Sequence, residues 1–137
     1  MTREIFVDTS GFFALLVKQD EKHRRSDRIL KGAAGSRRGF VTTDYVLDET
    51  STLLKARGHG HVLAEFFERV FASGACRVEW TDAERFATAQ SDFLKRLDQP
   101  WSFTDCLSFR VMNELRLTEA LTKDAHFQRA GFRALLM

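Results

Sequence analysis

The stretch Ile5-Phe6-Val7-Asp8-Thr9-Ser10-Gly11 places an acidic residue at the end of a short apolar run. The run 5–7 is typical of a buried strand, and the run Phe12-Phe13-Ala14-Leu15-Leu16 that follows indicates a helix. A strand that leads directly into a helix favours a fold in which helices cover a sheet. Burial of the Asp8 carboxylate would cost several kcal/mol without a neutralising cation, so this residue is also a candidate for function.

The same alternation of short apolar runs and longer helical patterns continues along the chain, and it favours a parallel sheet over a helical bundle. We predict strands at residues 4–7, 39–42, 77–80, 119–122 and 132–135. We predict helices at residues 10–17, 23–33, 44–56, 61–72, 82–97, 103–115 and 125–129. The expected fold class is α/β, with a central parallel sheet of about five strands flanked by helices.

Length and composition indicate a single globular domain. The 137 residues, 44% of them hydrophobic, suffice for one core of the usual domain size but not for two. Thirteen Phe and a single Pro are typical of a well-filled apolar core, and no linker, low-complexity tract or internal repeat divides the chain. We therefore expect one domain over residues 1–137.

The sequence also indicates the cellular compartment in which the protein acts. No apolar run approaches the roughly 18 residues that a membrane-spanning helix needs, so nothing in the sequence suggests a membrane protein. Cys76 and Cys106 lack the spacing of a metal site, and no positively charged leader with an apolar segment precedes Ile5. These features favour a reducing cytoplasm.

Four carboxylates lie where an apolar stretch would carry them inward: Asp8, Glu49, Asp105 and Asp124. In parallel α/β sheets, ligands bind at the carboxyl ends of the strands, and two of these acids directly follow the first and fourth predicted strands. The chain carries 21 Lys and Arg against 19 Asp and Glu, so the part outside these four acids has a formal charge of +6. A basic surface around an acidic centre suits an enzyme that acts on a polyanion.

Each acid also has a structural interpretation. Asp8 is placed to cap the helix that follows it. Glu49 shares a helix face with Val46 and Leu53, whereas Asp48 falls on a polar face, so Glu49 should point inward and Asp48 outward. An ion pair with the nearby Arg57 would equally satisfy a buried Glu49.

The other two acids have capping interpretations as well. Asp105 follows Ser102 by three residues, in the form of a capping box, and shares an apolar helix face with Phe109 and Met112. Asp124 is placed to cap the short helix 125–129. The local sequence alone leaves capping and metal binding open for both.

The neighbours of the four acids favour a hard cation. Hydroxyl side chains lie beside them in the sequence, at Thr9, Ser10, Thr104 and Thr122. Oxygen ligands suit Mg²⁺ or Mn²⁺, whereas zinc favours His or Cys. The pair in His59-Gly60-His61 lacks further ligands, and His23 and His126 stand in no recognisable cluster, so we assign none of the four histidines to the site.

These motifs resemble the PIN-domain family, and in particular VapC-type toxins of prokaryotic toxin-antitoxin pairs. The resemblance spans nearly the whole chain and rests on four segments in order: Phe6-Val7-Asp8-Thr9-Ser10, Asp44-Tyr45-Val46-Leu47-Asp48-Glu49-Thr50, Ser102-Phe103-Thr104-Asp105-Cys106 and Leu121-Thr122-Lys123-Asp124-Ala125-His126-Phe127.

The resemblance implies a PIN-like three-layer sandwich and a ribonuclease. Carried over by motif, the acids that hold Mg²⁺ or Mn²⁺ would be Asp8, Glu49, Asp105 and Asp124, and the hydroxyls Thr9, Ser10, Thr104 and Thr122 would support them. The implied substrate is RNA. The implied protein partners are a second copy of the chain, as a homodimer, and a small VapB-type antitoxin.

Contacts with RNA phosphates would come from basic side chains, with candidates at Arg24, Arg25, Arg37, Arg38, Arg57 and Lys123. For any one of these, a solvated surface charge is the simpler interpretation. Trp101 is a candidate for base stacking, but packing in the core or in a dimer would explain it equally well.

Other functions remain open on the sequence alone. A haloacid-dehalogenase-like phosphatase needs a second Asp two residues after the first, where this chain has Ser10. The segment Asp8-Thr9-Ser10-Gly11 is similar to the aspartic-protease triplet, but it has an extra Ser and lies in an α/β pattern. A housekeeping RNA-processing nuclease and a catalytically silent RNA- or protein-binding module on the same fold remain as alternatives.

Overall fold

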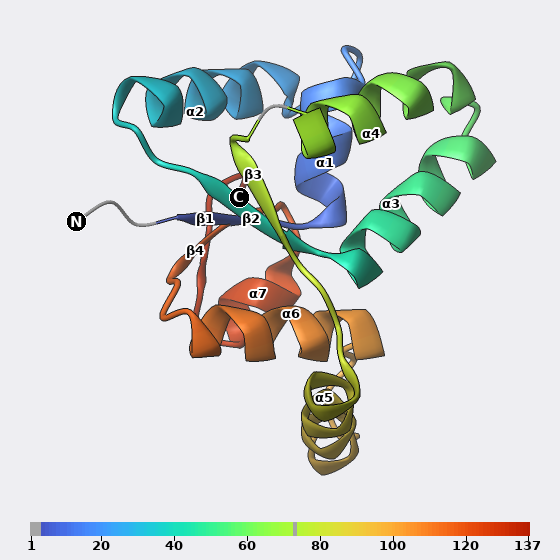
Figure 1. Ribbon diagram of the computed structural model, residues 1–137, viewed down its shortest axis with the longest axis vertical. Helices are drawn as coiled ribbons and strands as arrows, with labels where there is room; N and C mark the ends of the chain where they lie inside the picture. Colours follow the sequence, from blue (N-terminus) through green and yellow to red (C-terminus); the bar gives the residue numbers. More distant parts are fainter. Residues whose placement is uncertain (1–3, 73) are drawn as a thin grey trace.

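A computed structural model describes residues 4–72 and 74–137 of the chain (Figure 1). Within them, a five-stranded sheet has the order β3-β2-β1-β4-β5, and all of its pairings are parallel. The strands are β1 (Ile5–Val7), β2 (Phe40–Thr43), β3 (Cys76–Glu79), β4 (Glu119–Leu121) and β5 (Arg133–Ala134). The predicted parallel sheet is therefore present.

Helices connect the strands. They are α1 (Thr9–Leu16), α2 (His23–Gly35), α3 (Asp44–Ala56), α4 (Leu63–Ala72), α5 (Ala83–Lys95), α6 (Phe103–Glu114) and α7 (Ala125–Arg129). Every predicted helix has a counterpart, but the one expected at 61–72 begins with a separate 3₁₀ turn, η1 (Gly60–Val62). The longest helices have 13 residues, and none in the described ranges is long and apolar enough to cross a membrane.

The core lies on both faces of the central strands. β1 and β2 read as uninterrupted buried runs, because helices cover both faces of the sheet. Figure 1 shows α1, α2 and α4 on one side and α6 and α7 on the other. On the α6–α7 side, Phe109 packs edge-on against Phe127, and its ring is tilted by 31° from that of Phe132.

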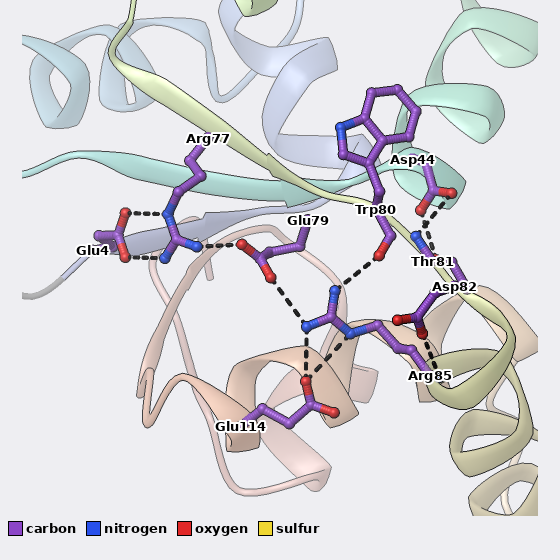
Figure 2. A network of polar contacts seen from close by, with 9 residues as sticks. All are labelled: Glu4, Asp44, Arg77, Glu79, Trp80, Thr81, Asp82, Arg85 and Glu114. Atoms are coloured by element: carbon purple, nitrogen blue, oxygen red, sulfur yellow. Dashed lines mark hydrogen bonds and ion pairs between the residues drawn. The ribbon is translucent and has the colours of Figure 1, made fainter.

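A network of ion pairs ties the edge of the sheet to α5 and α6 (Figure 2). Arg77 on β3 pairs with Glu4 and with Glu79. Glu79 also pairs with Arg85 on α5, whose guanidinium reaches Glu114 near the end of α6 at 2.8 Å. Single exposed pairs contribute little to stability, but here two arginines share one carboxylate, which fixes how α5 leaves the sheet.

A close approach between α1 and β4 sets the position of the first turn of α1. A Cβ atom added at Gly11 would lie 2.1 Å from the carbonyl oxygen of Leu121. The backbone N–H of Asp8 donates a hydrogen bond to the same carbonyl at 3.3 Å. Only glycine allows this contact, and it places the residues around Asp8 beside the end of β4.

Replacement of Gly11 by Ala should therefore destabilise the fold, by about 2 kcal/mol or more, because a methyl group would push α1 away from β4. The matched control is Gly32→Ala in α2, where an added Cβ meets nothing within 4 Å. That change should stabilise the protein by roughly 0.5–1 kcal/mol through helix propensity. Urea unfolding of both variants tests this, and equal effects would contradict the close approach.

Candidate metal centre

The pairing of β1 with β4 brings two distant segments of the chain together at one strand end. Val7 pairs with Leu121, so Asp8 and Thr122 emerge side by side. The Thr122 hydroxyl donates to Asp8 Oδ2 at 3.0 Å and accepts from the backbone N–H of Asp124 at 3.0 Å. Since Thr122 has one hydroxyl proton, the Ser10 hydroxyl at 3.0 Å donates to Thr122. The Ser10 and Thr122 hydroxyls thus form a chain of hydrogen bonds that ends on the Asp8 carboxylate.

Glu49 reaches the same place from α3. The Thr9 hydroxyl donates to Glu49 Oε1 at 2.7 Å, and the Thr50 hydroxyl donates to Thr9 Oγ1 at 3.3 Å. This chain of hydroxyls turns the Glu49 carboxylate toward α1. Asp48 is exposed, so the helix-phase prediction is confirmed for both acids.

The alternative ion pair between Glu49 and Arg57 does not form among the described residues. The Arg57 guanidinium lies over the ring of Phe13, 5.3 Å from its centroid. Arg57 nevertheless faces the same cavity as Glu49. The Arg57 guanidinium is therefore close to the carboxylates but forms no ion pair with Glu49.

Asp105 and Asp124 cap helices and also face the site. Asp105 forms the predicted capping box, in which its Oδ2 accepts the Ser102 N–H at 3.1 Å and its own N–H donates to Ser102 Oγ at 3.0 Å. Asp124 Oδ1 accepts the backbone N–H of His126 at 2.9 Å. Asp8 stands at the N-cap of α1, but its side chain makes no capping hydrogen bond. Capping thus explains part of the role of two acids and nothing of the role of Asp8.

All four predicted acids line one open cavity of about 450 Å³. Thr9 and Ser10 line it as well, together with Arg57, Lys123 and His126. Thr104 is half-buried on α6 and does not line the cavity. The structure thus brings together the acids and two of the four hydroxyls, holds Thr122 directly behind them, and leaves Thr104 aside.

The expectation that His126 stands in no cluster was wrong. His126 Nδ1 lies 3.0 Å from Asp105 Oδ2 and 3.5 Å from Asp124 Oδ1. These three side chains form a group whose ligand atoms all lie within 4.8 Å of one another. The spacing Asp124-Ala125-His126 was a usable signal for the pair with Asp124, but the contact with α6 depends on tertiary packing.

The electrostatics of the site disfavour one more negative charge. The pKa of the Asp8 carboxyl is raised from 3.8 to about 7, mainly by burial and to a smaller extent by the charges of Asp105 and Glu49. Hydrogen bonds from the Thr9 backbone and the Thr122 hydroxyl oppose this shift in pKa. A cation would remove the cost of ionising Asp8.

The donor atoms fit a hard divalent ion. In Glu49, Asp105 and Asp124, one carboxylate oxygen accepts hydrogen bonds, and the other has no hydrogen-bond partner in residues 4–72 and 74–137. Carboxylates oriented in this way by neighbouring donors are pre-arranged as ligands. The oxygen-rich set suits Mg²⁺ or Mn²⁺.

The PIN-domain model matches residues 5–133 of the chain, from β1 into β5. The chain belongs to the PIN-domain family. The resemblance inferred from the sequence motifs is therefore confirmed, and PIN nucleases use a divalent metal, in keeping with the acidic cavity.

Relatives with known names place the chain more closely within the PIN-domain family. The 23S rRNA-specific endonuclease VapC20 of Mycobacterium tuberculosis is 34% identical over 128 residues, which cover 93% of this chain and 95% of the relative. The VapC ribonuclease of Archaeoglobus fulgidus is 32% identical over 123 residues, 88% of this chain and 77% of the relative. This PIN domain is thus a homologue of VapC-type ribonucleases.

Solved structures of similar fold agree. The crystal structure of M. tuberculosis VapC20, a sarcin-ricin loop cleaving toxin, has a TM-score of 0.82 at 30% identity and covers 94% of this chain and 96% of its own. PAE2754 from Pyrobaculum aerophilum has a TM-score of 0.64 at 14% identity, over 98% and 91% of the two chains, and shows the fold alone. The α/β class, a parallel sheet flanked by helices, is confirmed.

Asp8→Asn should stabilise the metal-free protein at pH 8. The raised pKa of Asp8 means that the native state holds a proton which the unfolded state loses at lower pH, so wild-type stability falls between pH 4 and pH 8. The difference between the ordinary pKa of 3.8 and the raised pKa of about 7 corresponds to a loss of about 4 kcal/mol of stability at pH 8. Asparagine removes this loss, so the two proteins should be similar at pH 4 and differ most at pH 8.

Urea unfolding with a chelator at both pH values tests this, with the exposed Asp48→Asn as the control. The control should follow the wild-type pH profile. The same profile for Asp8→Asn as for wild type would mean that Asp8 is not the titrating group.

Proposed function

We propose that this chain is a metal-dependent endoribonuclease that hydrolyses RNA phosphodiester bonds, and that it acts as the toxin of a type II toxin-antitoxin pair. The observation that carries the proposal is the convergence of four acids, from four separate segments, in one cavity. The homology to proteins named VapC ribonuclease and 23S rRNA-specific endonuclease supports RNA as the substrate.

In this proposal, Mg²⁺ or Mn²⁺ would be held by Asp8, Glu49, Asp105 and Asp124. A bound ion of this kind supplies an activated water and offsets charge at the phosphodiester. The chain's own contribution is orientation: Thr9 fixes Glu49, Thr122 fixes Asp8, and Ser102 fixes Asp105. Fixed carboxylates of this kind need little rearrangement when substrate enters.

Two basic residues are best placed to contact the RNA backbone. Arg57 and Lys123 line the cavity of the four acids, and neither forms an ion pair within the described part of the chain. Of the other candidates, Arg38 pairs with Glu119 at 2.6 Å, which gives it a structural role. Arg24, Arg25 and Arg37 do not line the cavity.

Trp101 is better explained by packing than by base stacking. Its ring lies edge-on against Phe109, with the centroids 5.2 Å apart, and its indole nitrogen is buried. It lines a cavity between α5 and α6 that does not include the four acids. We therefore do not assign it to RNA binding.

Glu49→Gln should reduce RNA cleavage by at least about 100-fold, because an amide cannot replace the charge of the carboxylate at the metal. Asp48→Asn is the matched control: it makes the same chemical change one residue earlier on α3, on an exposed side chain, and should retain wild-type activity. Purified 23S rRNA is the first substrate to test, beside a transfer RNA pool, because the M. tuberculosis relative is named as a 23S rRNA-specific endonuclease.

The assay would contain Mg²⁺ or Mn²⁺, with EDTA as a further control. Cleavage that survives EDTA or the Glu49→Gln change would contradict the metal-dependent nuclease. No cleavage of any RNA by folded wild-type protein would favour a silent binding module. Cleavage of transfer RNA precursors without toxicity would favour a housekeeping nuclease.

We also propose two protein partners, a second copy of the chain and a small VapB-type antitoxin, both acting in the cytoplasm. Exposed apolar side chains along and after α5, at Phe86, Leu94 and Leu97, offer a surface for the second copy. Light scattering should give twice the 15.7 kDa chain mass, and Leu94→Glu should lower the measured mass to that of one chain.

Co-expression with the product of a small upstream gene should yield a larger, RNase-inactive complex. Unchanged mass and activity would argue against the antitoxin.

A further inference from the structure

We propose that His126 supplies a nitrogen ligand to the ion held by Asp105 and Asp124, and that this donor makes the site favour transition-metal ions over Mg²⁺. This inference rests on the metal site of the proposed function. It goes beyond the four carboxylates, because it assigns a fifth side chain and a metal preference that an all-oxygen site would lack.

The distances around His126 match those between ligands of one ion. In octahedral coordination, adjacent donors are separated by √2 times the bond length, which is roughly 2.9 Å for bonds of about 2.0–2.1 Å. His126 Nδ1 lies 3.0 Å from Asp105 Oδ2 and 3.5 Å from Asp124 Oδ1. The imidazole nitrogen and the two carboxyl groups, with one ligand atom of each within 4.8 Å of the others, are thus close enough to serve a single ion.

Main-chain hydrogen bonds hold this arrangement without an ion. The backbone N–H of His126 donates to Asp124 Oδ1 at 2.9 Å, which fixes the start of α7 against its own acid. Asp105 is held from the other side by the Ser102 N–H at 3.1 Å. The imidazole is 29% exposed and faces the cavity of the four acids, so a solvated ion can reach it.

The competing role for His126 is to position Asp105 through a hydrogen bond. A neutral imidazole carries one N–H and one lone pair. If Nδ1 keeps the proton, it donates to Asp105 and cannot bind an ion; if the proton sits on Nε2, the Nδ1 lone pair is free to bind. The two roles therefore differ in whether a nitrogen is bonded to the metal.

The chemical consequence is selectivity. Carboxylate and water ligands suit Mg²⁺ and Mn²⁺, whereas imidazole adds affinity for transition ions in the order Mn²⁺ below Co²⁺ below Ni²⁺. Loss of a nitrogen ligand should weaken Co²⁺ more than Mg²⁺. Loss of a positioning hydrogen bond should weaken both ions to a similar extent.

The test uses full-length wild type and three variants with added Mn²⁺, Co²⁺ or Mg²⁺. His126→Gln retains an N–H that can reach Asp105 but lacks an imidazole, and His126→Ala removes both. The control is His61→Ala, an exposed histidine in η1 that does not line the site cavity. Pulsed electron paramagnetic resonance of bound Mn²⁺, in protein with ¹⁵N-labelled histidine, detects a directly bonded imidazole nitrogen.

We expect the nitrogen coupling in wild type and His61→Ala and its loss in both His126 variants. Co²⁺ affinity should fall about 10-fold or more in both His126 variants, while Mg²⁺ affinity changes less than about 3-fold. Bound Mn²⁺ without nitrogen coupling in wild type would overturn the inference, as would equal losses of Co²⁺ and Mg²⁺ in the variants.

RNA cleavage measured on the same samples separates this inference from the proposed function. Nitrogen coupling in a protein that cuts no RNA would support His126 as a metal ligand and contradict the proposed nuclease activity. RNA cleavage by wild type with Mn²⁺, but without nitrogen coupling, would support the nuclease activity and contradict His126 as a metal ligand. If no ion binds at millimolar concentration, both the metal-dependent nuclease and the His126 ligand are contradicted.

Discussion

The site depends on one hydrogen bond across the sheet, from the Thr122 hydroxyl to the buried carboxylate of Asp8. It forms because β1 and β4 are parallel neighbours, so their carboxyl ends meet at one edge. Gly11 makes the contact possible by letting α1 approach the Leu121 carbonyl. The same bond orients Asp8, while burial raises its pKa to about 7. The fold therefore holds a carboxylate whose ionised form is costly until a cation arrives.

The helix caps have two roles in this protein. Asp105 and Asp124 satisfy backbone N–H groups at the starts of α6 and α7, and each still has a carboxylate oxygen for the cavity. A cap fixes a side chain as firmly as the helix it begins, so capping is an efficient way to pre-orient a ligand. Asp8 differs, because its side chain leaves the cap of α1 unfilled and turns to Thr122. Capping and metal binding, which the sequence offered as alternatives, are compatible in this geometry.

Most of the fold and most of the site could be predicted from local patterns. The buried strand β1 is a continuous apolar run, β2 begins with the apolar pair Phe40-Val41, and the inward phase of Glu49 followed from Val46 and Leu53. The predictions failed where long-range packing decides. His126 faces Asp105, 21 positions away in the sequence, only because α7 packs near α6. Thr104 does not line the cavity, although it is next to Asp105 in the sequence. Packing also decided between two interpretations of Glu49, because Arg57 lies over the ring of Phe13 instead of pairing with Glu49.

The sequence by itself determined the α/β class, the parallel sheet and the four acids, because hydrophobic period, turn positions and the order of motifs are local properties of the chain. Only the tertiary structure decided which donors surround the acids. Thr9 meets Glu49 across 40 residues, and Thr122 meets Asp8 across 114. Such contacts depend on strand order and on the angle at which helices cross the sheet, and neither can be predicted from a short segment of sequence. The contact of His126 with Asp105 was likewise set by packing.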